Sequence, residues 1–202
     1  KNNTILINDV RYSPAGVLAP IQRSDLAFTM HMLYHLSETG TCAIVEFPGV
    51  LYRGGAEKKI REYLIKNNFV DTVIQLPANL FFGVGIATCI IVIKKNKKDN
   101  NILFVDASKE CEKKGDKNKL EDENQNRIVN AYQERKEKQY FTKLVSNDEV
   151  LSNGANLSVS SYVEKEDKRE VIDIVALNEE IEALSKDVAS KSLKLNEIIK
   201  EL

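Results

Sequence analysis

Two histidines are the first residues in this 202-residue chain whose type and spacing could do chemistry. His31 and His35 stand four positions apart, so a helix would place both imidazoles on one face, where they could hold a metal ion. A zinc protease would also need a glutamate between them, and none is present. No other group of candidate ligands accompanies the pair. We therefore interpret both histidines as packing and polar surface residues and expect no metal site.

A glycine turn at Gly54 and Gly55 is the second candidate, since it joins an apolar run at 42–45 to a helical pattern at 56–67. Its spacing matches neither a P-loop nor a dinucleotide-binding loop, which argues against a self-contained nucleotide-binding enzyme. Four basic residues stand beside the turn, and we call them the basic cluster: Arg53, Lys58, Lys59 and Arg61. Two interpretations remain open, a tight turn with a solvated basic surface and a surface that contacts DNA phosphates.

Adjacent aromatic residues form the third candidate. Phe81 and Phe82 lie in a glycine-flanked loop at 80–85, directly after a predicted strand at 69–76. Such residues can simply fill the core. At the carboxyl edge of an α/β sheet, however, they also lie where ligands bind, and enzymes that modify bases stack the flipped-out base on apolar or aromatic side chains. The loop is therefore a candidate for stacking on a planar ligand.

Composition narrows the class of protein. Lys and Arg (29) nearly balance Asp and Glu (30), so net charge neither favours nor excludes nucleic acid. No apolar run approaches the roughly 20 residues that span a bilayer, and no secretion signal is visible, so we expect a cytoplasmic protein without a membrane partner. Cys42, Cys89 and Cys111 lack metal or redox spacing, and we expect reduced thiols, the first two buried in strands.

The elements that must position these residues alternate between helix and strand. Ser24 and Asp25 are suited to start a helix whose apolar residues recur up to residue 40, and a second helix follows the glycine turn. Four apolar runs predict strands, at residues 42–45, 69–76, 88–94 and 102–106. The alternation is typical of an α/β sheet. The short polar turn between the third and fourth strands favours an antiparallel hairpin at one edge of an otherwise parallel sheet.

The carboxyl-terminal third is different in character. A charged amphipathic helix is predicted at 120–138, and from about residue 171 the apolar residues follow a heptad pattern. The positions on this heptad seam are Leu177, Ile181, Leu184, Val188, Leu195, Ile198 and Leu202, with Lys191 as the polar break. This pattern predicts a coiled-coil or bundle helix, which either engages a partner or folds back on the same chain. We divide the chain into domains at 1–163 and 164–202.

Three segments together carry a family resemblance. They are residues 25–28 (DLAF), 49–61 (GVLYRGGAEKKIR) and 76–95 (LPANLFFGVGIATCIIVIKK), and 103–108 (LFVDAS) continues the pattern. In combination they resemble the modification subunit of type I restriction-modification systems, which are adenine-N6 DNA methyltransferases. The resemblance covers roughly residues 11–163. It implies an α/β fold, the carboxyl-terminal part of a Rossmann-like, S-adenosylmethionine-dependent methyltransferase sheet with an antiparallel edge hairpin, plus a helical tail.

Family members also carry two upstream motifs that this sequence lacks. One is a glycine-containing loop that binds S-adenosylmethionine, and the other is an Asn-Pro-Pro-Phe or Asn-Pro-Pro-Tyr motif that holds the adenine amino group. The complete enzyme that the resemblance implies transfers a methyl group to adenine N6 in duplex DNA, with the base flipped out. We therefore expect no catalytic residue in this chain and no methylation by the chain alone.

The resemblance implies roles for individual residues. Phe81 would stack on the flipped adenine, Asp25 and Leu26 would back the cofactor pocket, and the basic cluster would contact DNA phosphates unless it is simply solvated. The carboxyl-terminal helix resembles the segment that engages the specificity subunit. A second modification subunit and a restriction subunit are the other implied partners. The alternative function is a non-catalytic interaction module that docks on the specificity subunit.

Overall fold

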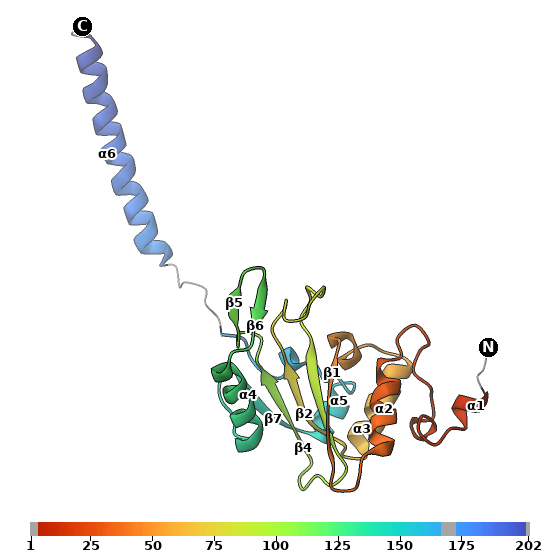
Figure 1. The fold of residues 1–202 in the computed structure, drawn as a ribbon. Helices are drawn as coiled ribbons and strands as arrows, with labels where there is room; N and C mark the ends of the chain where they lie inside the picture. Colours follow the sequence, from red (N-terminus) through yellow and green to blue (C-terminus); the bar gives the residue numbers. More distant parts are fainter. Residues whose placement is uncertain (1–3, 167–172, 201–202) are drawn as a thin grey trace. The chain divides into compact units, whose positions relative to one another are not determined.

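The structure is a computed structural model that describes residues 4–166 and 173–200. It divides into two compact units, Lys1–Lys165 and Glu166–Leu202 (Figure 1). The first unit contains the sheet and most helices, and one long helix is described in the second.

A five-stranded mixed sheet forms the centre of the first unit. Its strands, in spatial order, are β1 (Thr41–Glu46), β3 (Cys89–Lys94), β2 (Val70–Gln75), β4 (Asn101–Asp106) and β7 (Thr142–Ser146). The pair β2 and β4 is parallel, and the other three neighbouring pairs are antiparallel. The predicted α/β class and the four predicted strands are confirmed, whereas the expectation of an otherwise parallel sheet is wrong.

The predicted hairpin between the third and fourth strands is also wrong, because β2 lies between β3 and β4. Central placement of β3 covers its apolar side chains and pairs the backbone groups on both of its edges, whereas an edge hairpin would leave one edge open. The linker at 95–100 only has to cross two interstrand spacings, about 10 Å. An antiparallel hairpin does occur, but β5 (Glu112–Lys114) and β6 (Lys117–Lys119) form it.

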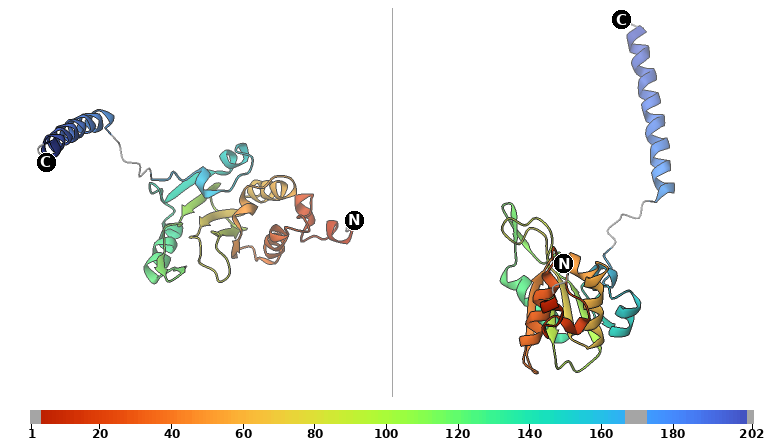
Figure 2. Two further views of the ribbon diagram at one scale, coloured as in Figure 1. Left: turned by 90° about the horizontal axis from the view of Figure 1, so that it is seen from above. Right: turned by 90° about the vertical axis from the view of Figure 1, so that its right-hand side faces the viewer.

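Helices cover both faces of the sheet, as Figure 2 shows. The longer ones in this unit are α2 (Asp25–His35), α3 (Ala56–Lys66) and α4 (Asp122–Glu134). The short ones are α1 (Thr4–Ile7), α5 (Asn147–Ser152), η1 (Ser13–Ala15), η2 (Pro48–Leu51) and η3 (Val159–Ser161). The three predicted helices are confirmed, although the first ends at His35 rather than near residue 40. Ser24 occupies the N-cap position of α2, but its side chain makes no capping hydrogen bond.

Two hydrophobic clusters hold these layers together. One joins α2 and α3 to the sheet and includes Leu26, Ile60 and Val73, and the other includes Ile74 and Ile128 from α4. Val73 and Ile74 are neighbours in β2, so their side chains point to opposite faces of the sheet. The sheet is therefore covered on both faces, as expected for an α/β domain.

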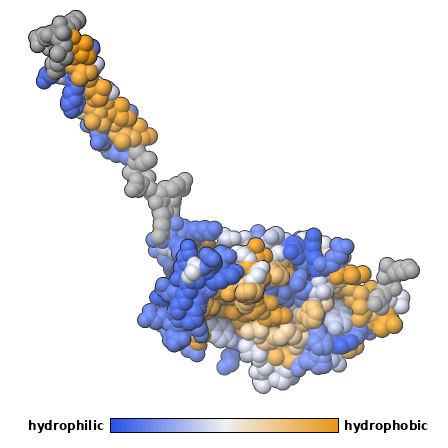
Figure 3. Space-filling view, turned by 45° about the horizontal axis from the view of Figure 1, so that its top comes forward, coloured by the Kyte–Doolittle hydropathy of each residue, from blue (hydrophilic) through white to orange (hydrophobic). Residues whose placement is uncertain are grey.

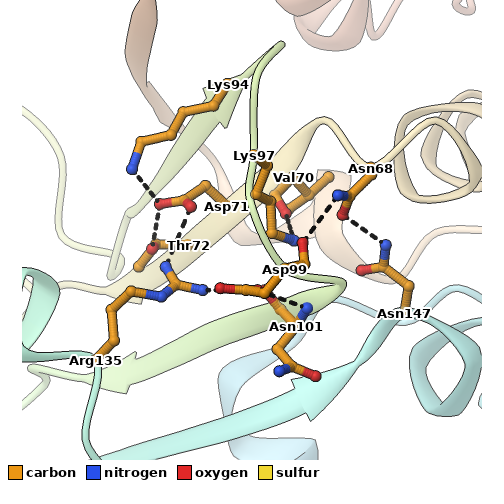
Figure 4. A network of polar contacts seen from close by, with 10 residues as sticks. All are labelled: Asn68, Val70, Asp71, Thr72, Lys94, Lys97, Asp99, Asn101, Arg135 and Asn147. Atoms are coloured by element: carbon orange, nitrogen blue, oxygen red, sulfur yellow. Dashed lines mark hydrogen bonds and ion pairs between the residues drawn. The ribbon is translucent and has the colours of Figure 1, made fainter.

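A polar network around Asp71 fixes one end of the sheet (Figure 4). The Asp71 side chain is only 3% exposed, and it accepts from Arg135 Nη1 at 3.1 Å, forms an ion pair with Lys94 Nζ at 3.2 Å and accepts from Thr72 Oγ1 at 3.0 Å. Arg135, the left-handed residue that ends α4, also donates to the carbonyl of Asn101 at 3.1 Å. The network thereby ties α4 to three neighbouring strands.

The second unit is the helix α6 (Ile174–Lys200). The heptad-seam residues whose side chains are described are all exposed, and Figure 3 shows apolar side chains gathered along one side of this helix: Leu177, Ile181, Leu184, Val188 and Leu195. Leu202 and the side chain of Ile198 lie outside what the structure describes. The predicted helix is confirmed. Among residues 4–166 and 173–200, no helix has the length and apolar character needed to cross a membrane.

Candidate functional site

A pocket of about 280 Å³ opens at the end of the sheet where β1 finishes and β3 begins. We call it the Phe81 pocket, and its lining residues are Asp25, Val45, Glu46, Phe47, Phe81, Val84 and Thr88. It brings together parts of the chain that are far apart in sequence, the first turn of α2, the end of β1 and the loop between β2 and β3. Two residues selected from the sequence, Asp25 and Phe81, therefore lie at one site.

Phe81 and Phe82 do not fill the core. Phe81 lines the pocket and is 41% exposed, whereas Phe82 is 99% exposed and takes no part in the lining. The β5–β6 hairpin supports this loop, since Lys117 Nζ donates to the Phe81 carbonyl at 3.2 Å and Asn118 Nδ2 donates to the Ala78 carbonyl at 2.8 Å. Hydrogen bonds from the β5–β6 hairpin thus hold the Phe81 loop in place at the pocket.

Glu46 is a pocket residue that the sequence analysis missed. It is 6% exposed, and one carboxyl oxygen, Oε1, accepts a hydrogen bond from Thr29 Oγ1 at 3.0 Å. Burial raises the pKa of Glu46 to about 7, the Thr29 hydrogen bond opposes this shift, and the nearby Asp25 charge adds to it. A charged residue at the end of the apolar run 42–45 was the available signal.

Thr88 was missed as well. It is 5% exposed, and its hydroxyl oxygen is buried without a hydrogen-bond partner among the described residues. Its backbone is well used, because the Thr88 carbonyl accepts from the Leu76 amide at 2.9 Å. A single threonine before an apolar strand gives no sequence signal, so only the structure identifies it.

Leu26 occupies a different environment from Asp25. Its side chain is 1% exposed and belongs to the core, so it supports the first turn of α2 from inside rather than lining the pocket.

A larger pocket of about 530 Å³ lies along α2 and the preceding segment. Its lining residues are mainly apolar: Leu6, Tyr12, Val17, Leu18, Ala19, Pro20, Ile21, Ser24, Ala27, Phe28, Met30 and Ile60.

The basic cluster does not form one surface. Arg61 is 1% exposed, and its guanidinium donates to the carbonyls of Ala155 and Val50, each at 2.8 Å. It cannot also contact DNA, which corrects the expectation for this residue. Helical spacing offered a signal, because the apolar Leu64 and Ile65 follow Arg61 by three and four positions and so place it on the inner face of α3.

The other three members of the basic cluster reach the surface. Arg53 Nη1 pairs with Glu57 at 3.2 Å, Lys58 lies 3.8 Å from a carboxyl oxygen of Glu62, and Lys59 is exposed. All three stand at or near the start of α3, where the helix dipole favours anions.

The two histidines contact aromatic rings. The His31 and His35 ring centroids are 4.5 Å apart, and Tyr12 and Tyr34 stack on or meet them edge-on. Within residues 4–166 and 173–200, no group of three or more His, Cys, Asp or Glu side chains is placed to hold a metal ion. The cysteines are free thiols, with Cys42 and Cys89 buried as predicted.

Comparison with known proteins decides the family. A family model described as N-6 DNA Methylase matches residues 1–171, most of the chain. The chain belongs to the N-6 DNA methylase family. The predicted resemblance to type I methylase subunits thus lies within a wider family, whose model covers residues 1–171.

Individual members of the N-6 DNA methylase family show the same likeness. The chain is 43% identical over 198 residues to the type I restriction enzyme MpnII methylase subunit of Mycoplasma pneumoniae, and it covers 36% of that protein while 98% of the chain is aligned. It is 34% identical over 177 residues to the MjaVII methylase subunit of Methanocaldococcus jannaschii, covering 30% of it with 85% of the chain. The chain thus spans about a third of the length of these curated relatives.

A solved structure of a type I methyltransferase subunit is also similar to this chain in fold and sequence. The methyltransferase subunit of a type I restriction-modification system from Streptococcus thermophilus superposes with a TM-score of 0.78 at 42% identity. The match covers 80% of this chain and 35% of that one. The fold class predicted for the chain is therefore confirmed by a relative of substantial identity as well as by its own sheet.

Proposed function

We propose that this chain forms part of the modification subunit of a type I restriction-modification system, which transfers a methyl group from S-adenosylmethionine to N6 of adenine in duplex DNA. Family membership and the likeness to type I methylase subunits support this function. The Phe81 pocket carries the proposal furthest, because it joins an exposed aromatic ring to buried polar groups at one edge of the sheet. In this proposal the protein works in the cytoplasm.

Phe81 is proposed to stack on the target adenine after that base has left the duplex. Its ring is partly exposed at the pocket, and the β5–β6 hairpin holds its loop in place, so little ordering remains to be done when the base arrives. Stacking of a base on an aromatic ring is worth about 1–3 kcal/mol. The fully exposed Phe82 has no such role.

S-adenosylmethionine would supply the methyl group, and the residues present fit one side of it. Asp25 places a carboxylate at the Phe81 pocket, which suits the positively charged groups of this cofactor. Leu26 would act indirectly by holding the first turn of α2 against the core. The larger pocket has no carboxylate in its lining and fits the cofactor less well. Asp25 and Leu26 thus account for the helix side of the cofactor site.

Arg53, Lys58 and Lys59 are proposed to contact DNA phosphates near the start of α3, and Arg61 is excluded because its guanidinium is used inside the protein. Solvation of a basic surface is the competing explanation. Each true phosphate contact contributes about 0.9 to the slope of log affinity against log salt. Lys59→Gln should therefore lower that slope by about one if Lys59 contacts DNA and leave it unchanged otherwise.

The exposed heptad seam of α6 supports a docking role for the second unit. We propose that it engages the specificity subunit, in an assembly with a second modification subunit and a restriction subunit. The second candidate function, a non-catalytic interaction module, rests on this same seam. Deletion of residues 175–202 tests it: loss of binding to the specificity subunit, with the first unit still folded, would assign docking to α6.

Base stacking at Phe81 can be tested with the 202-residue chain and a labelled DNA duplex that carries one adenine opposite an abasic site. Phe81→Ala should raise the dissociation constant about 5- to 150-fold, the equivalent of 1–3 kcal/mol. Phe82→Ala is the matched control and should bind like the unaltered chain. Equal affinities for Phe81→Ala and Phe82→Ala would refute stacking at Phe81. A calorimetric titration with S-adenosylmethionine, with Asp25→Asn as the variant, tests the cofactor assignment separately.

A further inference from the structure

The floor of the Phe81 pocket contains two polar side chains whose hydrogen-bonding capacity is not used up. Thr88 has a buried hydroxyl with no partner among the described residues. Glu46 uses Oε1 to accept from Thr29, while Oε2 has no hydrogen bond within residues 4–166 and 173–200. Buried polar groups normally have partners, so the buried Thr88 hydroxyl, at the same pocket as a carboxyl oxygen that can still form a hydrogen bond, points to a ligand that completes it.

Glu46 and Thr88 both line the Phe81 pocket, and strand pairing brings their backbones to the same end of the sheet. Glu46 ends β1 and is registered opposite Cys89, the residue directly after Thr88. A further contact fixes this pairing, because Cys89 Sγ donates to the Glu46 carbonyl at 3.4 Å. Glu46 is therefore held by the sheet itself, and Thr88 is held by its place directly before β3 and by the hydrogen bond from the Leu76 amide to its carbonyl, as a recognition site requires.

We propose that Glu46 and Thr88 are specificity-determining residues that read one edge of the adenine in the Phe81 pocket. Glu46, as a carboxylic acid, donates from Oε2 to a ring nitrogen, and the Thr88 hydroxyl accepts from the neighbouring amino group. This inference rests on the proposed function. The group recognised is a ring nitrogen that accepts a hydrogen bond beside an exocyclic amine. The two residues that recognise it were not selected by the sequence analysis.

The surroundings of Glu46 favour the protonated form that this role needs. Asp25 from α2 brings a second negative charge, and Thr29 donates to Oε1, which leaves the proton to Oε2. Cys89 from β3 stays neutral, because burial raises the pKa of its thiol to about 12. The loop at 77–87 contributes no titratable group. Since burial raises the pKa of Glu46 to about 7, its proton is lost on going from pH 6 to pH 8.5.

The test uses the same 202-residue chain and the same duplex, with affinity measured at pH 6 and pH 8.5. The unaltered chain should bind about tenfold more weakly at pH 8.5. Glu46→Gln keeps a donor that does not titrate. At both pH values it should therefore bind as tightly as the unaltered chain does at pH 6, without the tenfold loss at pH 8.5. Glu46→Leu should bind weakly at both pH values.

Two further comparisons identify the contacts. Duplexes with 1-deaza- or 7-deaza-adenine each lack one of the two ring nitrogens beside the amino group. One of the two should bind the unaltered chain about tenfold more weakly than the adenine duplex does, whereas Glu46→Leu should bind that analogue and adenine equally. The duplex with 3-deaza-adenine keeps both ring nitrogens and should bind like adenine. Thr88→Val should weaken binding severalfold, and Thr88→Ser, which keeps the hydroxyl, should restore it. Circular dichroism and urea unfolding of every variant identify any loss of fold.

The outcomes separate this inference from the proposed function. If Phe81→Ala weakens binding but the 1-deaza and 7-deaza analogues both bind like adenine, or Glu46→Gln retains the full pH dependence, the proposed contact of Glu46 with the base edge is wrong and stacking stands. If Phe81→Ala has no effect either, the base does not occupy this pocket and both fail. The affinities of Glu46→Gln at pH 6 and pH 8.5 decide whether Glu46 contacts the base, even if Glu46→Leu does not fold.

Discussion

Two buried carboxyl groups stand at opposite ends of the same sheet and have very different surroundings. Asp71 lies at the start of β2 and Glu46 at the end of β1, strands that run in the same direction. Asp71 has two cations and a hydroxyl against its oxygens, whereas Glu46 has one neutral hydroxyl. With about 3.3 Å per residue, the two are separated by roughly 13 Å along the strands.

By this contrast, the Asp71 end of the sheet is scaffold, and the end with the Phe81 pocket is the proposed site. The Asp71 network satisfies its charges internally and joins α4 to the strands, so a ligand would find nothing left to bind. The Phe81 pocket contains an acid that accepts one neutral hydrogen bond, an exposed ring and a buried hydroxyl without a partner among the described residues, and leaving that hydroxyl without a partner costs stability. Proteins commonly accept such costs where they bind substrates.

The largest expected effect concerns Asp71. Asp71→Asn removes the charge that Lys94 and Arg135 share, and breaking a buried ion pair should lower the free energy of unfolding by about 3–5 kcal/mol. Asp99→Asn is the matched control, because Asp99 meets the same arginine but is 45% exposed, and it should cost less than 1 kcal/mol. Urea unfolding measures both. Similar small losses in the two variants would mean that the Asp71 network does not stabilise this end.

At the other end of the sheet, the contribution of Glu46 to stability depends on pH. The pKa of Glu46 is about 7 in the folded protein and about 4.5 in a solvated glutamate, so the folded state binds its proton more tightly. Stability therefore falls as pH rises from 4.5 to 7. Glu46→Gln should raise the free energy of unfolding at pH 8 by roughly 2–3 kcal/mol and give none of this gain below pH 4.5. A loss of stability at pH 8 would contradict the contrast with Asp71.

Two buried threonines provide a smaller comparison. Thr142 Oγ1 accepts from the Lys138 amide at 2.8 Å and donates to the Lys136 carbonyl at 2.6 Å, whereas the Thr88 hydroxyl has no partner in the described part of the chain. Thr142→Val should cost about 1–3 kcal/mol, and Thr88→Val should be neutral or stabilise by about 1 kcal/mol. Thermal unfolding of both variants distinguishes them. Equal costs would show that Thr88 supports the fold.

The smallest expected effect on stability is at Phe81. Its ring is largely free of the core, so Phe81→Ala should change the free energy of unfolding by no more than about 0.5 kcal/mol. Phe104→Ala, at a fully buried ring in β4, should cost about 3–5 kcal/mol in the same urea experiment. If Phe81→Ala is as costly as Phe104→Ala, the loop belongs to the scaffold and the contrast between the two ends weakens.

Much of this protein could be read from local patterns. Helical spacing located α2, α3, α4 and α6, and apolar runs located β1 to β4, because those patterns report which side of each element is buried. The family resemblance selected Phe81 and Asp25, which the structure places at one pocket. The heptad seam is likewise a property of one continuous helix, so sequence alone sufficed to find it.

Other features depended on contacts between distant residues. The placement of β2 between β3 and β4 overturned the predicted hairpin, and the core-facing side of α3 removed Arg61 from the basic cluster. Glu46 and Thr88 are 42 positions apart and line one pocket only because β1 and β3 pair in one register. Sequence determined which residues are apolar, charged or aromatic and which elements they form. Strand order and register decided which polar groups find partners, because hydrogen bonding and burial depend on neighbours in space.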